Sequence, residues 1–343
     1  MNNYKILKIS EVSIDQLSEF YKKVFPSRYR ILSKNWRWWY RVDCFDYEPL
    51  VIIFENKVIG QAGLISVKLR IDDAIVPATW FVDFAILPEH QGKGLGHKIT
   101  IEWMKICPNQ ITFCNKKSLK IFKDLGWSSI NNTKRFVKLI NYTKFFPVIK
   151  KYELTSLNRL INFFDTKRFS KAELIKPFQL KNNYKQILDS FLAIKKHDTK
   201  FAEIYRDESW FNWRLLECPF NENIHFFEYK QNFAIVSVYM SNKIKRLNIL
   251  FTYFLDSSNQ EELFCSIIKW ALSNKIDLIW SNTNNDELIK KFEKVFTKKF
   301  YKSMDFASWS SNAKSKEILK FGLKNIQAID GDNDLSYIED YSL

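Results

Sequence analysis

The sequence lacks any apolar run long enough to cross a membrane. Its most hydrophobic stretches, such as residues 50–54 and 249–255, are far shorter than the ~20 apolar residues of a transmembrane helix. The N-terminal residues mix charges with isolated apolar side chains, unlike a signal peptide. From these absences we expect no membrane-spanning helix and a cytoplasmic protein.

Cysteine, glycine and proline are also few. The five cysteines are scattered over 343 residues, with no CxxC pair and no histidine at metal-ligand spacing. We therefore expect a reduced protein without disulfides and with no metal. With 8 glycines, 8 prolines and 46% apolar residues, the composition is that of a globular chain and excludes fibrous or disordered classes.

Acidic residues are under-represented in the first half of the chain. Residues 1–150 contain 24 Lys and Arg against 13 Asp and Glu, a net charge of +11, whereas residues 151–343 contain 29 against 25, a net charge of +4. A solvated Lys-rich surface explains such an excess as well as a bound anion does. Nucleic acid, an anionic membrane surface and a phosphorylated small molecule are the anions to consider.

Apolar periodicity predicts an α/β domain of about 140 residues. An amphipathic helix is expected at 14–24, a hairpin of strands over 50–71 and a further strand at 78–87. Residues 91–140 follow the order helix, strand, helix and strand, with Gly126 ending the second helix.

Part of this pattern is repeated later in the chain. A Trp-x-x-Trp pair followed by a cysteine occurs twice at an offset of 174 residues, as Trp36, Trp39 and Cys44 and as Trp210, Trp213 and Cys218. The strands and helices that follow match as well, which favours a tandem duplication. The predicted division is a first domain at 1–140, a connecting segment at 141–184, a second domain at 185–312 and a C-terminal tail at 313–343.

The sequence WFVDFAILPEHQGKGLGHKI is the segment that indicates chemistry. It places Gly92, Gly94 and Gly96 between an apolar strand and an amphipathic helix, where free backbone N–H groups hold anions. No Gly-Lys-Ser/Thr closes the segment, so it is not a Walker A loop, and its spacing differs from the dinucleotide motif GxGxxG. The segment predicts an anion-binding loop of another kind.

This loop resembles the pyrophosphate loop of the GNAT acetyltransferase family, Gln/Arg-x-x-Gly-x-Gly/Ala after a strand and a hydrophobic-x-Pro turn. The matching residues are Ile86-Leu87-Pro88 and then Gln91 to Gly96, and the family's later Asn and Gly-aromatic signature appears as Asn115 and Gly126-Trp127. The resemblance is good over residues 50–140. It implies two tandem GNAT-like domains of the α/β (α+β) class, each a mixed, mostly antiparallel twisted sheet flanked by helices.

The resemblance implies acetyl-CoA, or a related acyl-CoA, as the donor. The residues expected to bind it are Phe84, Ala85 and Ile86 through their main chain, Gln91, Gly92, Lys93, Gly94, Leu95 and Gly96 at the pyrophosphate, and Asn115. Side chains at positions 94 and 96 are expected to crowd the phosphates. The corresponding part of the second domain has acids and no glycine, so we expect it not to bind CoA.

The catalytic groups are less defined. Asp83 is the only charged residue of its strand, and it is either the base that deprotonates the acceptor amine or a structural carboxylate. His90 is an alternative base, although its loop position also fits simple solvation. Phe122 occupies the position where the family often has a tyrosine that protonates the leaving thiolate.

The acceptor is the least determined part. Arg37, Arg41 and Arg214 lie in the two tryptophan segments, where they either bind an acceptor phosphate or only accompany buried tryptophans. The leading interpretation is an N-acetyltransferase acting on a small amine, best an amino sugar, nucleotide- or lipid-linked, of a bacterial surface-polysaccharide pathway. The alternatives are a non-catalytic CoA- or anion-binding scaffold and a FemABX-like aminoacyl transferase. We expect no nucleic-acid partner, and leave peripheral membrane contact and the oligomeric state open.

Overall fold

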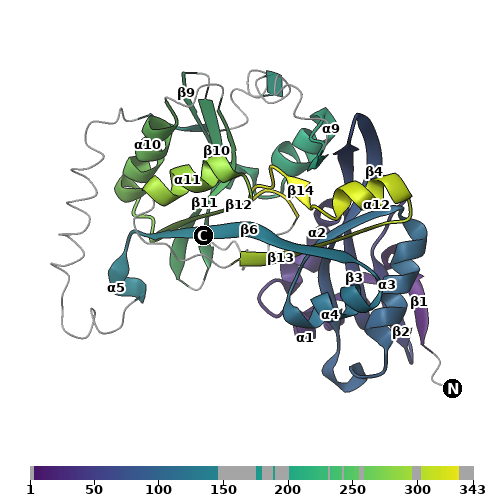
Figure 1. Cartoon of the computed structure of the whole chain (residues 1–343). Coiled ribbons are helices and arrows are strands. Elements are labelled where there is room, and N and C mark those ends of the chain that lie inside the picture. The colour runs from purple at the N-terminus through teal and green to yellow at the C-terminus, as the bar shows by residue number, and fades with distance from the viewer. Residues whose placement is uncertain are drawn as a thin grey trace.

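One continuous sheet runs through the described part of the protein (Figure 1). The structure is a computed structural model that describes residues 4–145, 175–179, 188–189, 201–230, 232–241, 243–254, 259–295 and 303–331. Within them the strands form a 14-stranded sheet with helices packed on it. Most of the predicted connecting segment lies outside the described residues.

The first half of the sheet follows the chain order. Its strands are β1 (Lys5–Lys8), β2 (Leu50–Phe54), β3 (Lys57–Ile71), β4 (Ala74–Ile86) and β5 (Asn109–Cys114), and they are antiparallel except for the parallel pair β4 and β5. Glu55 and Asn56 turn the hairpin between β2 and β3 with φ of 48° and 59°, the left-handed conformation that tight hairpins use.

Four helices accompany these strands. They are α1 (Ile14–Val24), α2 (Tyr29–Trp39), α3 (Leu95–Ile106) and α4 (Lys116–Asp124). Ser13 caps α1 in a capping box with Gln16, and α1 buries Leu17 and Phe20. The crossover between the parallel strands β4 and β5 is made by α3, as the predicted helix after the glycines requires.

The second half repeats this order of elements. Its members are β9 (Ile224–Tyr229), β10 (Asn232–Ser241), β11 (Ile244–Tyr253), α10 (Gln260–Ser273), β12 (Leu278–Thr283) and α11 (Asp286–Val295). Strands β9, β10 and β11 are antiparallel, and α10 crosses over from β11 to the parallel β12. Leu263, Ile267 and Phe292 bury the apolar faces of the two helices in one cluster.

The last strand of each half pairs with strands of the other half. β6 (Ser128–Leu139) follows α4 but pairs with β12, and β13 (Ser303–Ser310) follows α11 but lies between β5 and β6. Figure 1 shows β6 extending from one half to the other. The remaining elements are η1 (Ile9–Glu11), η2 (Pro88–His90), α5 (Tyr142–Phe145), β7 (Phe178–Gln179), β8 (Ala202–Ile204), α9 (Glu208–Phe211), η4 (Asn212–Leu216), η5 (Asn221–Asn223), α12 (Ala313–Leu319) and β14 (Leu323–Lys324).

The residues predicted as a C-terminal tail include a helix and a short strand. After α12 and β14, Ile326, Ala328 and Ile329 are buried, with at most 1% of each exposed. Their apolar side chains explain why this segment packs into the protein. This packing was not predicted, because acidic residues dominate the end of the sequence. The predicted fold class is confirmed as a mixed, mostly antiparallel sheet flanked by helices, whereas the domain boundaries stay predictions.

Candidate functional site

Strands β4 and β5 diverge just where the predicted donor site begins. Their parallel pairing covers Thr79 to Phe81 on β4, and β4 then continues to Ile86 paired with β3. Beyond Phe81, the edge of β4 that faces β5 therefore makes no strand pairing with β5. The main chain of Phe84 to Ile86 lies in this opening, where an extended ligand arm can pair with it.

The loop of residues 91–96, here called the glycine loop, connects this opening to α3. Gly94 caps α3 with φ of 73°, and Gly92 has φ of 76°. The Gln91 side-chain amide donates to the Ile86 carbonyl at 2.8 Å, which ties the loop to the end of β4. The first N–H groups of a helix have no intrahelical partners and attract anions, so the loop and the start of α3 have the backbone arrangement expected of an anion site, and binding of a pyrophosphate there stays a prediction.

The structure gives the glycines further reasons, while the predicted crowding of the phosphates stays a prediction. A Cβ on Gly94 would meet no protein atom within 4 Å, so its positive φ is what demands glycine there. A Cβ on Gly96 would lie 2.9 Å from Cδ1 of Ile121 and 3.2 Å from Cζ of Phe84. Gly96 therefore allows α3 to pack closely against α4 and β4.

Asp83 lies at a bulge of β4 and is held by three donors. Its φ is 46°, next to the register shift between Gln61 and Gly63 of β3. Oδ1 accepts a hydrogen bond from Nη2 of Arg28 at 2.7 Å, and Oδ2 accepts from Nε1 of Trp39 at 3.0 Å and from the Tyr40 hydroxyl at 3.2 Å. Only 1% of the Asp83 side chain is exposed.

A chain of hydrogen bonds continues from this carboxylate. Gln61 Nε2 donates to the Tyr40 hydroxyl at 2.7 Å, and the Tyr21 hydroxyl donates to Gln61 Oε1 at 2.7 Å. Burial raises the pKa of Tyr21 and of Tyr40 well above the usual value, so both hydroxyls stay protonated at neutral pH. Neither serves as a base. The action of Asp83 as a proton acceptor stays a prediction, and its contacts describe a positioning residue.

The other predicted residues near the loop lie in different surroundings. His90 packs against the rings of Tyr4 and Phe54, with centroids 6.0 and 5.4 Å away, and shares no described contact with Asp83. Asn115 Oδ1 caps α4 by accepting from two backbone N–H groups. Phe122 is 1% exposed and packs on Trp127 at 4.6 Å, so it is a core side chain. The predicted roles of His90 and Asn115 are untested.

The two tryptophan segments lie against each other. Nε1 of Trp38 donates to the Trp213 carbonyl at 2.8 Å, and Nε1 of Trp213 donates to the Trp38 carbonyl at 2.6 Å. The four tryptophans of the repeated motif are buried, as expected of core anchors: Trp36, Trp39, Trp210 and Trp213.

Of the three candidate acceptor arginines, Arg37 and Arg41 line one pocket with Ser209 and Trp213, and Arg214 does not line it. Arg41 donates to Oγ of Ser209 at 3.0 Å and is 4% exposed, whereas Arg37 lies exposed over the Trp36 ring. Arg214 is 1% exposed, and its Nε donates to the Ile329 carbonyl at 3.3 Å. The described contact of Arg214 therefore anchors the C-terminal segment, and its predicted contact with the acceptor stays a prediction.

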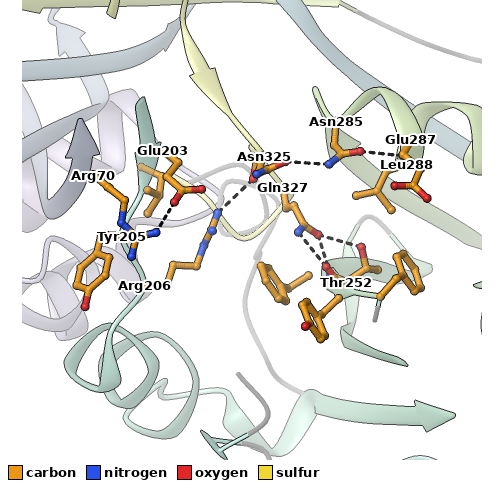
Figure 2. Close-up of a pocket in the computed structure, with 14 residues that line it drawn as sticks. Arg70, Glu203, Tyr205, Arg206, Thr252, Asn285, Glu287, Leu288, Asn325 and Gln327 are labelled. Carbon is orange, nitrogen blue, oxygen red and sulfur yellow. Dashed lines mark hydrogen bonds and ion pairs between the residues drawn. The ribbon is translucent and has the colours of Figure 1, made fainter. Parts of the chain in front are cut away.

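A cavity of about 300 Å³ lies between the halves (Figure 2). It is lined by Arg70 of β3, residues 203–206 at β8, residues 251–254 at the end of β11, the start of α11, and Asn325 and Gln327. This cavity could not be predicted from the sequence, because its lining comes from five separate stretches of the chain.

No three His, Cys, Asp or Glu side chains of the described residues come together as a metal site. Among the helices that the structure describes, none is long and apolar enough to span a membrane.

The chain is similar to acetyltransferases in sequence over its first part. Residues 12–127 match the model of the acetyltransferase (GNAT) family. No curated protein matches the sequence. Over these residues the chain is similar to the acetyltransferase (GNAT) family, and the predicted class of enzyme, a GNAT-type acyltransferase, is confirmed at that level.

Solved structures resemble nearly the whole chain. A GCN5-related N-acetyltransferase from Kribbella flavida has a TM-score of 0.60 at 10% identity, with 92% of this chain and 72% of that chain covered. A GCN5-related N-acetyltransferase from Anabaena variabilis has a TM-score of 0.55 at 14% identity, with coverages of 90% and 73%. The N-myristoyltransferase of Saccharomyces cerevisiae with bound myristoyl-CoA has a TM-score of 0.56 at 11% identity, with coverages of 90% and 83%. At these identities the likeness concerns the fold.

Proposed function

We propose that the protein is an N-acyltransferase that moves an acetyl group from acetyl-CoA to the amine of a small acceptor. The observation that carries the proposal is the glycine loop at the start of α3, directly beside the opening between β4 and β5. The glycine loop offers N–H groups to a pyrophosphate, and the exposed edge of β4 in the opening offers main-chain groups to an extended ligand arm. CoA has both features in one molecule, and its negative charge suits the +11 of residues 1–150.

In this proposal the donor is bound mainly by backbone. Residues 91–96 hold the pyrophosphate, Lys93 adds positive charge, and the main chain of residues 84–86 pairs with the pantetheine. Asn115 keeps the start of α4 fixed beside the opening through its cap. The acceptor nitrogen then attacks the thioester carbonyl carbon, the C–S bond breaks, and the CoA thiolate leaves. Phe122 has no proton to give, so we assign protonation of the thiolate to solvent.

We assign Asp83 a positioning role. Its carboxylate fixes Arg28 and α2 to the bulge of β4, and this bulge directs the main chain of Phe84 into the opening. The proton of the acceptor ammonium leaves through water, with His90 as the remaining candidate side chain.

We also propose that the chain is a tandem duplication whose second half has lost the donor site. The order β2, β3, β4, α3, β5, α4 recurs as β9, β10, β11, α10, β12, α11. Pairing of β11 with β12 ends at Asn248 and Trp280, as pairing of β4 with β5 ends at Phe81. The second half thus has an equivalent opening.

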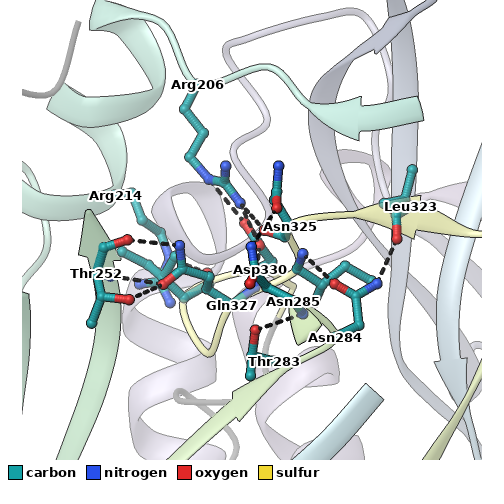
Figure 3. A network of polar contacts seen from close by, with 12 residues as sticks. Arg206, Arg214, Thr252, Thr283, Asn284, Asn285, Leu323, Asn325, Gln327 and Asp330 are labelled. Atoms are coloured by element: carbon teal, nitrogen blue, oxygen red, sulfur yellow. Dashed lines mark hydrogen bonds and ion pairs between the residues drawn. The ribbon is translucent and has the colours of Figure 1, made fainter. Parts of the chain in front are cut away.

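The C-terminal segment fills that second opening. The Ile329 N–H donates to the Leu250 carbonyl of β11 at 3.0 Å, and Gln327 bonds to both main-chain groups of Thr252. Gln327 also bridges to Thr283 of β12. Figure 3 shows Gln327 beside Thr252 within this network. Because protein backbone already occupies the position, and because α10 begins with Glu261 and Glu262, we propose one acetyl-CoA per chain.

The best acceptor remains an amino sugar, nucleotide- or lipid-linked, of a bacterial surface-polysaccharide pathway. Arg37, which is exposed and lies over the Trp36 ring, supports it, since rings stack on sugars and guanidinium groups bind phosphates. A CoA-binding scaffold without catalysis is the second candidate, favoured by Phe122 at the position of the usual general acid. A FemABX-like aminoacyl transferase is the third, and the glycine loop argues for CoA instead.

Release of free thiol from acetyl-CoA tests the proposal. The purified chain is incubated with acetyl-CoA and a panel of amines that includes glucosamine, its nucleotide-linked form and alkyl amines. Amine-dependent thiol release supports the transferase. Tight CoA binding without thiol release for any amine supports the scaffold, and transfer from aminoacyl-tRNA supports the third candidate.

A further inference from the structure

The cavity between the halves has no place in the donor site described above. Its volume of about 300 Å³ is at the lower end of ligand pockets, which measure about 300–1,000 Å³. It has room for one ring and not for an extended cofactor. Figure 2 shows its polar side chains on opposite walls, with Arg70 and Tyr205 on one side and Asn285 and Glu287 on the other.

The charges of the cavity are already balanced. Nη1 of Arg70 contacts Oε1 of Glu203 at 2.7 Å, and Nη2 of Arg206 contacts Oδ2 of Asp330 at 2.5 Å. Glu287 adds one more carboxylate to the lining. Since both guanidinium groups have carboxylate partners, a phosphate or another anion finds no uncompensated positive charge here. The occupant is neutral or carries an amine.

Hydrogen-bonding groups remain for such an occupant. Tyr205, Tyr253 and Asn325 line the cavity, and no bond from the two tyrosine hydroxyls or from the Asn325 side-chain nitrogen to another described residue is present. Asn325 is held in place through its oxygen, which accepts from Asn285 at 2.8 Å. Hydroxyls donate and accept, so they match a ligand that does the same.

Aromatic faces complete the lining. Phe251, Tyr253 and Phe254 at the end of β11 line the cavity together with Tyr205. A sugar ring has C–H groups that pack on such faces, and hydroxyls around its edge that meet the polar groups. From this combination we propose that the cavity binds a neutral or amine-bearing monosaccharide unit of the acceptor, an inference that rests on the proposed acyltransferase function.

The cavity is connected to the first half by the C-terminal segment. Arg206 lines the cavity and holds Asp330, and the next residue is Gly331, where a Cβ would lie only 2.7 Å from Cε2 of Trp80. Trp80 belongs to β4, three residues before Asp83. The wall of the cavity is therefore connected, through this segment, to the strand that carries the donor opening.

Binding of glucosamine and N-acetylglucosamine to the full chain, without acyl-CoA, tests the inference by calorimetry or ligand-observed NMR. Cyclohexylamine serves as a probe that has the ring and the amine but no hydroxyls. Tyr253→Phe and Asn325→Gly each remove one polar group, and glycine suits the positive φ of 55° at Asn325. We expect saturable sugar binding, no binding of cyclohexylamine, and about fivefold weaker binding in each variant, the worth of one hydrogen bond.

Matched controls are Tyr229→Phe and Asn56→Gly, which make the same changes outside the cavity, Asn56 also at positive φ (59°). Absence of sugar binding, equal losses in the controls, equal binding of cyclohexylamine, or displacement of the sugar by CoA would each overturn the inference. Because binding is scored without turnover, sugar binding in a protein that acylates no amine would leave the inference standing and refute the proposed function.

Discussion

Replacing Asp83 by asparagine separates a positioning residue from a base. The change keeps one side-chain oxygen for Trp39 and Tyr40 but removes the negative charge opposite Arg28. The Arg28 side chain is only 9% exposed, so its charge would remain buried without its carboxylate. Breaking a buried pair in this way costs about 3–5 kcal/mol, and we expect the lower end because the guanidinium also stacks on the Phe25 ring at 4.8 Å.

Urea unfolding and pH–rate profiles read out this prediction. We expect Asp83→Asn to lose about 3 kcal/mol of unfolding free energy, with reduced activity but unchanged limbs of the pH–rate profile. The control Asp72→Asn, at an exposed pair with Lys314, should lose much less unfolding free energy, because solvent screens the pair. If Asp83→Asn instead kept its stability, lost about 100-fold or more in kcat and lost the acidic limb, Asp83 would be the general base and our assignment would be wrong.

Three further predictions follow from the packing. Gly96→Val should cost about 1–3 kcal/mol because its Cβ would overlap Ile121, and a thermal midpoint equal to wild type would refute this. Arg214→Ala should speed amide exchange at Ile329 without changing acetyl-CoA affinity, whereas weakened CoA binding with unchanged exchange would contradict the anchoring role. Burial raises the pKa of Asp207, but its hydrogen bonds from Lys68 and from a helix N–H outweigh burial, and the pKa is lowered overall. The stability that this carboxylate contributes should therefore be lost as the pH falls through the lowered pKa. Asp207→Asn should make the unfolding free energy less dependent on pH on the acid side, and an unchanged dependence would refute this.

Local features of the fold could be predicted because neighbouring residues determine them. The glycine loop, the hairpin turn at Glu55 and Asn56 and the end of α4 at Gly126 each depend on backbone conformations that specific residues allow. The spacing of apolar residues likewise predicted α1 and α3. For the donor side of the candidate site, sequence reasoning therefore predicted the backbone of the glycine loop, and its binding of CoA stays a prediction.

Long-range features could not be predicted in this way. The apolar pattern of β13 says that it is a strand, but not that it joins β5 of the other half. The partners of Asp83 were missed because Arg28 lies 55 residues away, in a turn with no motif. The cavity and the filling of the second opening by residues 325–330 depend on the same kind of distant contact.

Calorimetric titration of acetyl-CoA tests the central claim most directly. Gly94→Val should weaken binding at least tenfold, about 1.4 kcal/mol, because valine does not adopt the φ of 73° that directs the loop toward the anion. Gly126→Val is the matched control, since Gly126 has φ of 79° and equally open surroundings but ends α4. The account predicts one site per chain, weakened in Gly94→Val and kept in Gly126→Val. Two equal sites, or unchanged affinity in folded Gly94→Val, would contradict it.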